Sequence, residues 1–95
     1  MIRSFADDAT EDLWDGEMTA RARRFSAIEK AAMRKLMLLN AATKLGDLDG
    51  VPGNWLEALK GNLRGWHSIR INKQWRVIFR WRDDGPHDVK ITDYH

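Results

Sequence analysis

The residues of this chain that could carry out chemistry lie mainly in its second half. From Lys60 to Arg82 the sequence contains seven lysines and arginines and no acidic residue. Such a stretch produces a local positive field that suits polyanions such as nucleic acid. The competing interpretation is a solvated strand face, whose charge is balanced by residues 1–20, where one arginine stands against six acids.

A few residues of this half of the chain could carry out acid–base chemistry at a bound phosphate. His95 can act as acid or base, because an unperturbed imidazole titrates near pH ~6.5. Arg76 can hold a phosphate through two parallel hydrogen bonds, and Lys60 can add a point charge. The ordinary alternatives remain open at this point, since a terminal histidine is usually only a chain end and strand arginines are usually solvated.

The elements that must position these residues change character midway along the chain. Asp7 is a good N-cap for a short helix that Gly16 ends, and residues 2–5 could form a short strand before it. A capping box from Ser26 to Glu29 predicts a second helix that begins near Ala27. Its buried face follows spacings of three and four through Phe25, Ile28, Ala32, Leu36 and Leu39.

After the break at residues 51–53 the apolar period becomes two. Residues 66–72, 75–81 and 87–94 are predicted to be strands joined by turns at 72–73 and 83–86. In the middle strand Trp75, Val77, Phe79 and Trp81 share one face, and Arg76, Ile78, Arg80 and Arg82 share the other. The pattern predicts an α+β fold with helices first and an antiparallel sheet after them.

Length and composition exclude several classes of protein. Ninety-five residues predict one domain over 1–95, and the absence of cysteine excludes disulfides and zinc–thiolate sites. No apolar stretch approaches the roughly 18 residues that span a bilayer, and residues 1–5 lack the apolar region of a signal peptide. We therefore expect a cytoplasmic protein without a membrane partner.

Three runs of sequence resemble a known family. They are residues 54–61 (NWLEALKG), 68–76 (SIRINKQWR) and 93–95 (DYH), and residues 1–5 (MIRSF) also fit. In combination they resemble the HigB family of the RelE/ParE toxin superfamily, also called plasmid-maintenance killer proteins, over nearly the whole chain. This resemblance implies a RelE-like fold, in which two N-terminal helices pack on a twisted antiparallel sheet.

The resemblance also implies a function and partners. HigB toxins belong to type II toxin–antitoxin systems and cleave mRNA in the ribosomal A site without a metal or cofactor. The implied partners are the 70S ribosome with its mRNA and a HigA antitoxin with a helix-turn-helix domain. Operator DNA would be reached only through that antitoxin. A second reading on the same fold is a ParE-like toxin that cuts nothing and poisons a protein target such as DNA gyrase.

Cleavage through the RNA's own 2′-hydroxyl needs a base, an acid and cations at phosphorus. The resemblance assigns this chemistry to five residues: Lys60, Arg76, Asp93, Tyr94 and His95. Glu57 is the sixth candidate, because a carboxylate can replace an imidazole as general base. Contact with RNA or the ribosome is expected from five others: Trp55, Arg64, Arg70, Lys73 and Arg80. Glu57 stands where some family members carry a histidine, so it is either the general base or only an ion-pair partner of Lys60 or Arg76. No spacing of His, Asp or Glu resembles a metal site.

Overall fold

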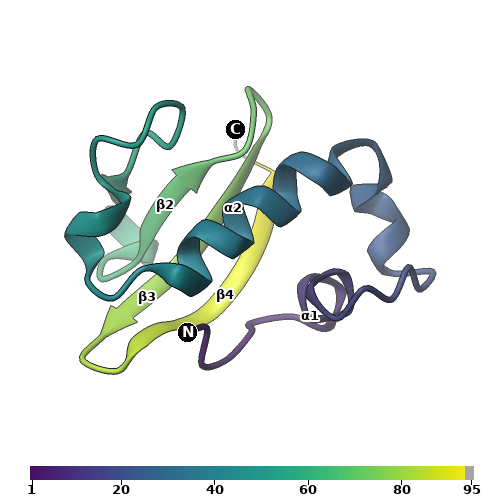
Figure 1. Cartoon of the computed structure of the whole chain (residues 1–95), viewed down its shortest axis with the longest axis horizontal. Coiled ribbons are helices and arrows are strands. Elements are labelled where there is room, and N and C mark those ends of the chain that lie inside the picture. The colour runs from purple at the N-terminus through teal and green to yellow at the C-terminus, as the bar shows by residue number, and fades with distance from the viewer. Residues whose placement is uncertain (94–95) are drawn as a thin grey trace.

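The computed structural model describes residues 1–93, and Figure 1 shows their path. Helices and 3-10 turns fill the first half, and strands fill most of the second half. In chain order the elements are α1 (Asp8–Trp14), the 3-10 turn η1 (Ala22–Ile28), α2 (Glu29–Ala41), η2 (Leu45–Leu48), β1 (Glu57–Ala58), η3 (Gly61–Leu63), β2 (His67–Arg70), β3 (Trp75–Arg82) and β4 (Gly85–Asp93).

The four strands form one antiparallel sheet in the order β1-β2-β3-β4. The register places Ser68 opposite both Glu57 and Ile78, and Arg76 opposite both Arg70 and Thr92. The register shifts between Ile78 and Arg80, as at a β-bulge. The predicted α+β class with an antiparallel sheet is confirmed.

Helix α2 runs across one face of the sheet (Figure 1), which we call the inner face. Side chains from both layers are fully buried there, including Phe25, Leu36, Leu39, Ile69, Val77, Phe79 and Ile91. The predicted helical face and the predicted apolar face of the middle strand therefore meet in one core. Helix α1 packs against α2 and the edge strand β4, and none of the helices in residues 1–93 combines the length and apolarity needed to cross a membrane.

The two helix starts differ in how well the sequence anticipates them. Asp7 caps α1 as predicted, because its Oδ1 accepts from the Thr10 amide at 2.9 Å. The capping box at Ser26 is wrong: residues 22–28 form η1, and α2 begins at Glu29 without a side-chain cap. The burial of Phe25 and Ile28 under the sheet stabilises the tighter 3-10 turn there.

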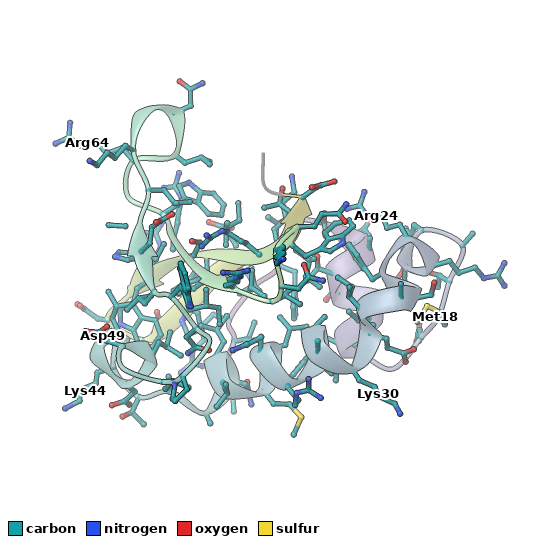
Figure 2. All side chains as sticks on the ribbon, turned by 90° about the horizontal axis from the view of Figure 1, so that it is seen from above. Met18, Arg24, Lys30, Lys44, Asp49 and Arg64 are labelled. Atoms are coloured by element: carbon teal, nitrogen blue, oxygen red, sulfur yellow. The ribbon has the colours of Figure 1, made fainter. Side chains whose placement is uncertain are left out.

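The strand predictions hold for three strands and miss a fourth. Residues 2–5 contribute one isolated bridge, from Phe5 to Val89, in place of a strand. The two-residue strand β1 was not predicted, because its only strand character is its pairing with His67 and Ser68 of β2. Figure 2 shows that the loop carrying Arg64 projects from the sheet on the side opposite α2. Lys30 marks the α2 side in the same view.

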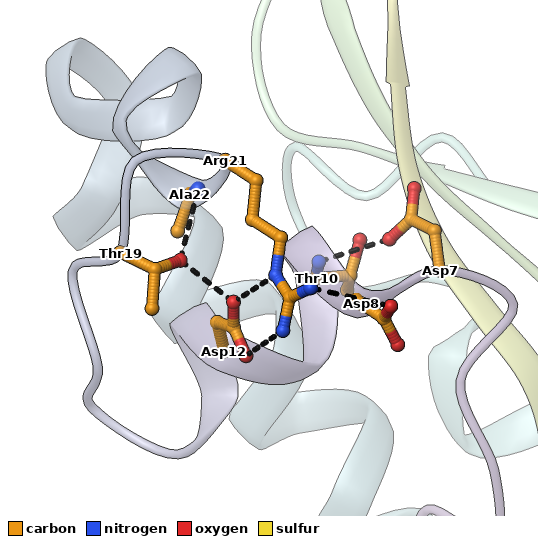
Figure 3. A network of polar contacts seen from close by, with 7 residues as sticks. All are labelled: Asp7, Asp8, Thr10, Asp12, Thr19, Arg21 and Ala22. Carbon is orange, nitrogen blue, oxygen red and sulfur yellow. Dashed lines mark hydrogen bonds and ion pairs between the residues drawn. The ribbon is translucent and has the colours of Figure 1, made fainter.

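A polar network ties α1 to the segment that follows it (Figure 3). The buried Asp12 accepts from the Thr19 hydroxyl at 2.6 Å and from Arg21 Nε at 2.5 Å. Arg21 also reaches Asp8 at 3.3 Å. Arg21 is the largest cause of the lowered pKa of Asp12, followed by Thr19. The carboxylates of Asp8 and Asp12 on α1 are thus paired with Arg21 within the helical layer.

Candidate active site on the outer face of the sheet

The face of the sheet turned away from α2, here called the outer face, carries most of the candidate residues. Strand alternation places Ile69, Val77 and Ile91 inward, so their neighbours point outward. The outer face therefore contains Glu57, Ser68, Arg70, Arg76, Ile78, Lys90 and Thr92, in rows that the strand register defines. Residues from all four strands meet on one surface.

Arg76 is at the centre of this surface. Its side chain is 12% exposed, its Nη1 donates to the buried Ser68 hydroxyl at 3.2 Å, and the same atom lies 3.9 Å from Glu57 Oε1. Arg70 faces it directly across the strand pair. Two arginines on neighbouring strands add to the positive field of this surface.

The ion pair between Glu57 and Arg76 is a loose one. The Glu57 side chain is 45% exposed, and 3.9 Å is longer than a hydrogen bond. Partly exposed pairs of this kind contribute at most about 1 kcal/mol. Glu57 is therefore close enough to Arg76 to share a substrate with it, and weakly enough held to act on a hydroxyl group. This geometry is compatible with both roles that the sequence leaves open for Glu57.

Asp93 ends β4 next to this surface. Its backbone pairs with Trp75, and its Oδ2 accepts from Gln74 Nε2 at 3.0 Å. Asp93 also lines the cleft described below. Tyr94 and His95 lie outside the described residues, so their predicted place beside Arg76 stays a prediction.

Lys60 and Arg64 lie on the loop of residues 59–66, which projects from the outer face. Both side chains are exposed, and Lys60 shares a shallow surface groove with Glu57. The loop is closed by its own backbone bonds, including Leu59 N to Trp66 O at 2.9 Å and Trp66 N to Leu63 O at 2.9 Å. Lys60 is thus near Glu57, while Arg64 is absent from the lining of that groove.

Trp55 and Arg70 form a stacked pair beside the site. The Arg70 guanidinium lies 4.8 Å from the centre of the Trp55 ring, and Trp55 is 65% exposed. The Trp55 backbone has a φ of 48°, an uncommon value for a residue with a bulky side chain. The exposed aromatic face next to a guanidinium is suited to stacking on a nucleobase.

The neighbouring Asn54 holds Trp55 in place. Asn54 is fully buried: its carbonyl accepts from Arg70 N at 2.6 Å, its Nδ2 donates to Leu48 O at 3.1 Å, and its Oδ1 accepts from Lys35 Nζ at 2.6 Å. Burial, with a smaller contribution from Arg34, lowers the pKa of Lys35. Sequence reasoning missed this link between α2 and the 51–56 loop, because the two residues are 19 positions apart.

The two remaining RNA-contact candidates are separate from Arg76. Arg80 lies 4.9 Å from the Trp66 ring centre and 3.9 Å from Asp88 Oδ2, toward the β3–β4 hairpin. Lys73 is exposed in the turn between β2 and β3. His67, which follows Trp66, packs inward on Phe79 with ring centres 6.2 Å apart. The cations of this half of the chain therefore extend along the outer face and do not converge on one point.

Sequence reasoning also missed Lys90. Lys90 follows Val89 on β4, faces Ile78 across the strand pair, and lines a cleft of about 360 Å³ with Leu59, Leu63, Ser68, Ile78, Thr92 and Asp93. The signal was present in the alternation of Val89, Lys90, Ile91 and Thr92, which places Lys90 on the same face as Arg76 once the register is known. Among residues 1–93 we find no group of three or more His, Asp or Glu side chains arranged to hold a metal.

Comparison with known proteins agrees with this architecture. Residues 3–95 match the family described as the RelE-like toxin of type II toxin–antitoxin system HigB. Toxin HigB-1 of Vibrio cholerae is 46% identical over 83 residues, which cover 87% of this chain and 86% of that protein.

Two further matches concern a more distant relative and a solved complex. Endoribonuclease HigB of Proteus vulgaris is 30% identical over 61 residues, which cover 64% of this chain and 65% of that protein. Among solved structures, a YoeB–YefM complex from Staphylococcus aureus matches with a TM-score of 0.62 and 26% identity, covering 100% of this chain and 98% of that chain. The likeness therefore extends to both sequence and fold.

Proposed function

Because the chain belongs to the family of RelE-like HigB toxins from type II toxin–antitoxin systems, we propose that it is an endoribonuclease that cleaves mRNA on the ribosome. Cleavage in the A site would stop translation and growth. The observation that carries this proposal is the contact of Arg76 with Ser68 and Glu57 on the outer face, next to the end of β4. The relative from Proteus vulgaris that is named an endoribonuclease supports the activity.

The proposed reaction is attack of the RNA's 2′-hydroxyl on the adjacent phosphorus. The oxygen–phosphorus bond to the next nucleotide breaks, which leaves a 2′,3′-cyclic phosphate and a 5′-hydroxyl. Arg76 and Lys60 stabilise the charge on the phosphate, and Glu57 or His95 removes the proton from the 2′-hydroxyl. We assign to His95 the return of a proton to the leaving oxygen, to Tyr94 the orientation of the RNA, and to Asp93 the orientation of a neighbouring cation or imidazole.

The proposed contacts with RNA and the ribosome lie around this centre. Trp55 and Arg70 form an exposed stacking surface, and the loop and turn cations Arg64 and Lys73 extend it. Arg80 extends the same face toward the β3–β4 hairpin. Each contact with a phosphate releases counterions, so affinity for the ribosome should fall steeply with salt.

The proposed partner in the cell is a HigA-type antitoxin with a helix-turn-helix domain, through which operator DNA is contacted. The matching complex of YoeB with YefM supports an antitoxin partner in general. Since mRNA and ribosomes are the proposed substrate, we place the protein in the cytoplasm. We also propose that α1 and α2 with the sheet follow the arrangement of the RelE/ParE superfamily.

The test is to map cut sites on a translated reporter mRNA by primer extension after induction. Purified protein is then incubated with the same mRNA, with and without ribosomes. We expect cuts within codons in cells, and in vitro only when ribosomes are present. Cutting of free mRNA at equal rates would contradict the ribosome dependence. Intact transcripts together with blocked replication would overturn the nuclease and favour a ParE-like toxin acting on gyrase.

A further inference from the structure

The cleft beside Arg76 has features that the cleavage chemistry does not use. Its floor is Ile78, which is 6% exposed, and one wall consists of Leu59 and Leu63 from the 59–66 loop. Leu63 is 40% exposed, so part of its side chain is open to a ligand. Most of the lining is thus apolar, and at about 360 Å³ the cleft is in the size range of small-ligand sites.

The apolar wall is held in a fixed position. Leu59 and Leu63 sit on a loop whose ends are joined by the hydrogen bond from Leu59 N to Trp66 O at 2.9 Å, and Trp66 N donates to Leu63 O at 2.9 Å. A third bond, from Leu63 N to Lys60 O at 3.2 Å, closes the turn at Gly61, where φ is 63°. A flat ligand can therefore enter a formed slot without ordering the loop first.

The rim of the cleft is polar and carries a cation. Lys90 lines it and is half-buried, and no ion pair within residues 1–93 involves this lysine. Lys90 also lines a second opening with Arg24, Trp75 and Asp93 at the end of β4. Ser68, which accepts from Arg76, and Thr92, which pairs with Arg76, connect the cleft to the candidate active site.

We propose that this cleft is a nucleobase subsite for the nucleotide next to the bond that is cut, and that Lys90 holds a phosphate of that nucleotide. A nucleotide combines an apolar plane with an anionic linker, which matches an apolar slot with a lysine at its rim. This inference rests on the proposed RNA cleavage. It adds Leu59, Leu63, Ile78 and Lys90 as positioning residues to a site otherwise defined by charge and acid–base groups.

The first experiment measures single-turnover cleavage of a short mRNA in the A site of purified ribosomes. Leu63→Ala should raise the half-saturating toxin concentration about fivefold to tenfold and leave the maximal rate nearly unchanged, since an apolar contact with a bound base is lost. Lys90→Gln should weaken binding and reduce the slope of log affinity against log salt by about 1. Leu63→Ala should leave that slope unchanged.

Matched controls lie on α2, away from the outer face. Leu38 is 40% exposed, the same as Leu63, and Lys30 is exposed on the far side of the molecule (Figure 2). Leu38→Ala and Lys30→Gln should behave as wild type. The mRNA is also made with an abasic residue at each position around the cut. At one of those positions the effect of Leu63→Ala should disappear, because the base that it contacts is missing.

A second measurement separates failure of the subsite from failure of the proposed activity. Methyl NMR spectra are recorded with a six-nucleotide RNA in which every 2′-hydroxyl is methylated, so that it cannot be cleaved by the proposed route. Shifts at Leu59, Leu63 and Ile78 support the subsite even if wild type cleaves nothing. If wild type cleaves mRNA but these methyls do not shift, or Leu63→Ala matches Leu38→Ala, the subsite is wrong while the nuclease stands.

Discussion

The α1–η1 corner and the outer face of the sheet both pair arginine with carboxylate, but they do so in different ways. In the corner Arg21 bonds Asp12 at 2.5 Å, and the Asp12 side chain is 10% exposed (Figure 3). On the outer face Arg76–Glu57 and Arg80–Asp88 are each 3.9 Å apart, beyond hydrogen-bond length. Short, multiply bonded pairs hold the fold together, whereas loose pairs can be replaced by a bound phosphate at little cost.

The largest expected effect compares one arginine from each region. Arg76→Ala should reduce mRNA cleavage about 10²–10³-fold, the usual consequence of removing a donor that stabilises transition-state charge. Arg21→Ala should lower the melting temperature and leave cleavage per folded molecule unchanged. Cleavage rates and thermal unfolding are measured on both variants. Equal losses of activity at equal folded concentration would remove the distinction between the two regions.

Glu57→Gln is expected to have the next largest effect. If the loosely held carboxylate takes the proton from the 2′-hydroxyl, the rate should fall about 10²-fold with little change in stability. The substitution preserves shape and removes the charge. Single-turnover rates from pH 5 to 9 provide the measurement. A rate within a few-fold of wild type would leave Glu57 as an ion-pair partner of Arg76 and assign the base to His95.

A smaller effect is expected at the exposed aromatic surface. Trp55→Ala should weaken ribosome binding about tenfold, at the low end for loss of a stacked base, while Trp55→Phe should retain most of the affinity. Trp14, which packs against the core of the corner, provides the contrast: Trp14→Ala should lower stability. Binding is measured by sedimentation with ribosomes. The stacking role fails if phenylalanine and alanine weaken binding equally.

The smallest effect on cleavage is expected at Asp12, where the consequence is confined to stability. Hydrogen bonds, above all from Arg21, lower the pKa of Asp12. The ionised carboxylate therefore stabilises the fold at pH values above its ordinary pKa of 3.8, and this stabilisation is lost as pH falls through the pKa of the folded state. Asp12→Asn should therefore unfold at lower temperature at pH 7, and the gap to wild type should close below pH 3.8. Asp15→Asn, at an exposed position, is the control for thermal scans across pH.

Several features of the fold could be predicted because they depend on local pattern. The alternation from Trp75 to Trp81 and the helical spacing from Phe25 to Leu39 both correctly identified the inner core. The start of α2 could not be predicted from the Ser26 capping box, because the burial of Phe25 and Ile28 outweighs one side-chain cap. The bridge from Phe5 to Val89 joins residues 84 positions apart and has no local signal.

The candidate site likewise contains some features that the sequence predicts and others that depend on the tertiary structure. Sequence alone indicated that Arg76 faces away from the core, and the family resemblance indicated that Glu57 stands where some members carry a histidine. Neither indicated that Lys90 lines a cleft with Leu59 and Leu63, or that Lys35 holds Asn54 beneath the Trp55 stack. Those relationships depend on strand register and on the path of the 59–66 loop, and a single chain's composition carries neither.

By itself the sequence determined which faces are apolar and where positive charge accumulates, since both follow from residue type and a period of two or 3.6. Only the tertiary structure decided at what distance each of these arginines meets a given carboxylate. Arg21 met Asp12 because α1 and the following segment fold back on each other, and Arg76 met Glu57 only at 3.9 Å because β1 lies across β2 from it. Pairing depends on distances across the fold, which are set when the layers pack.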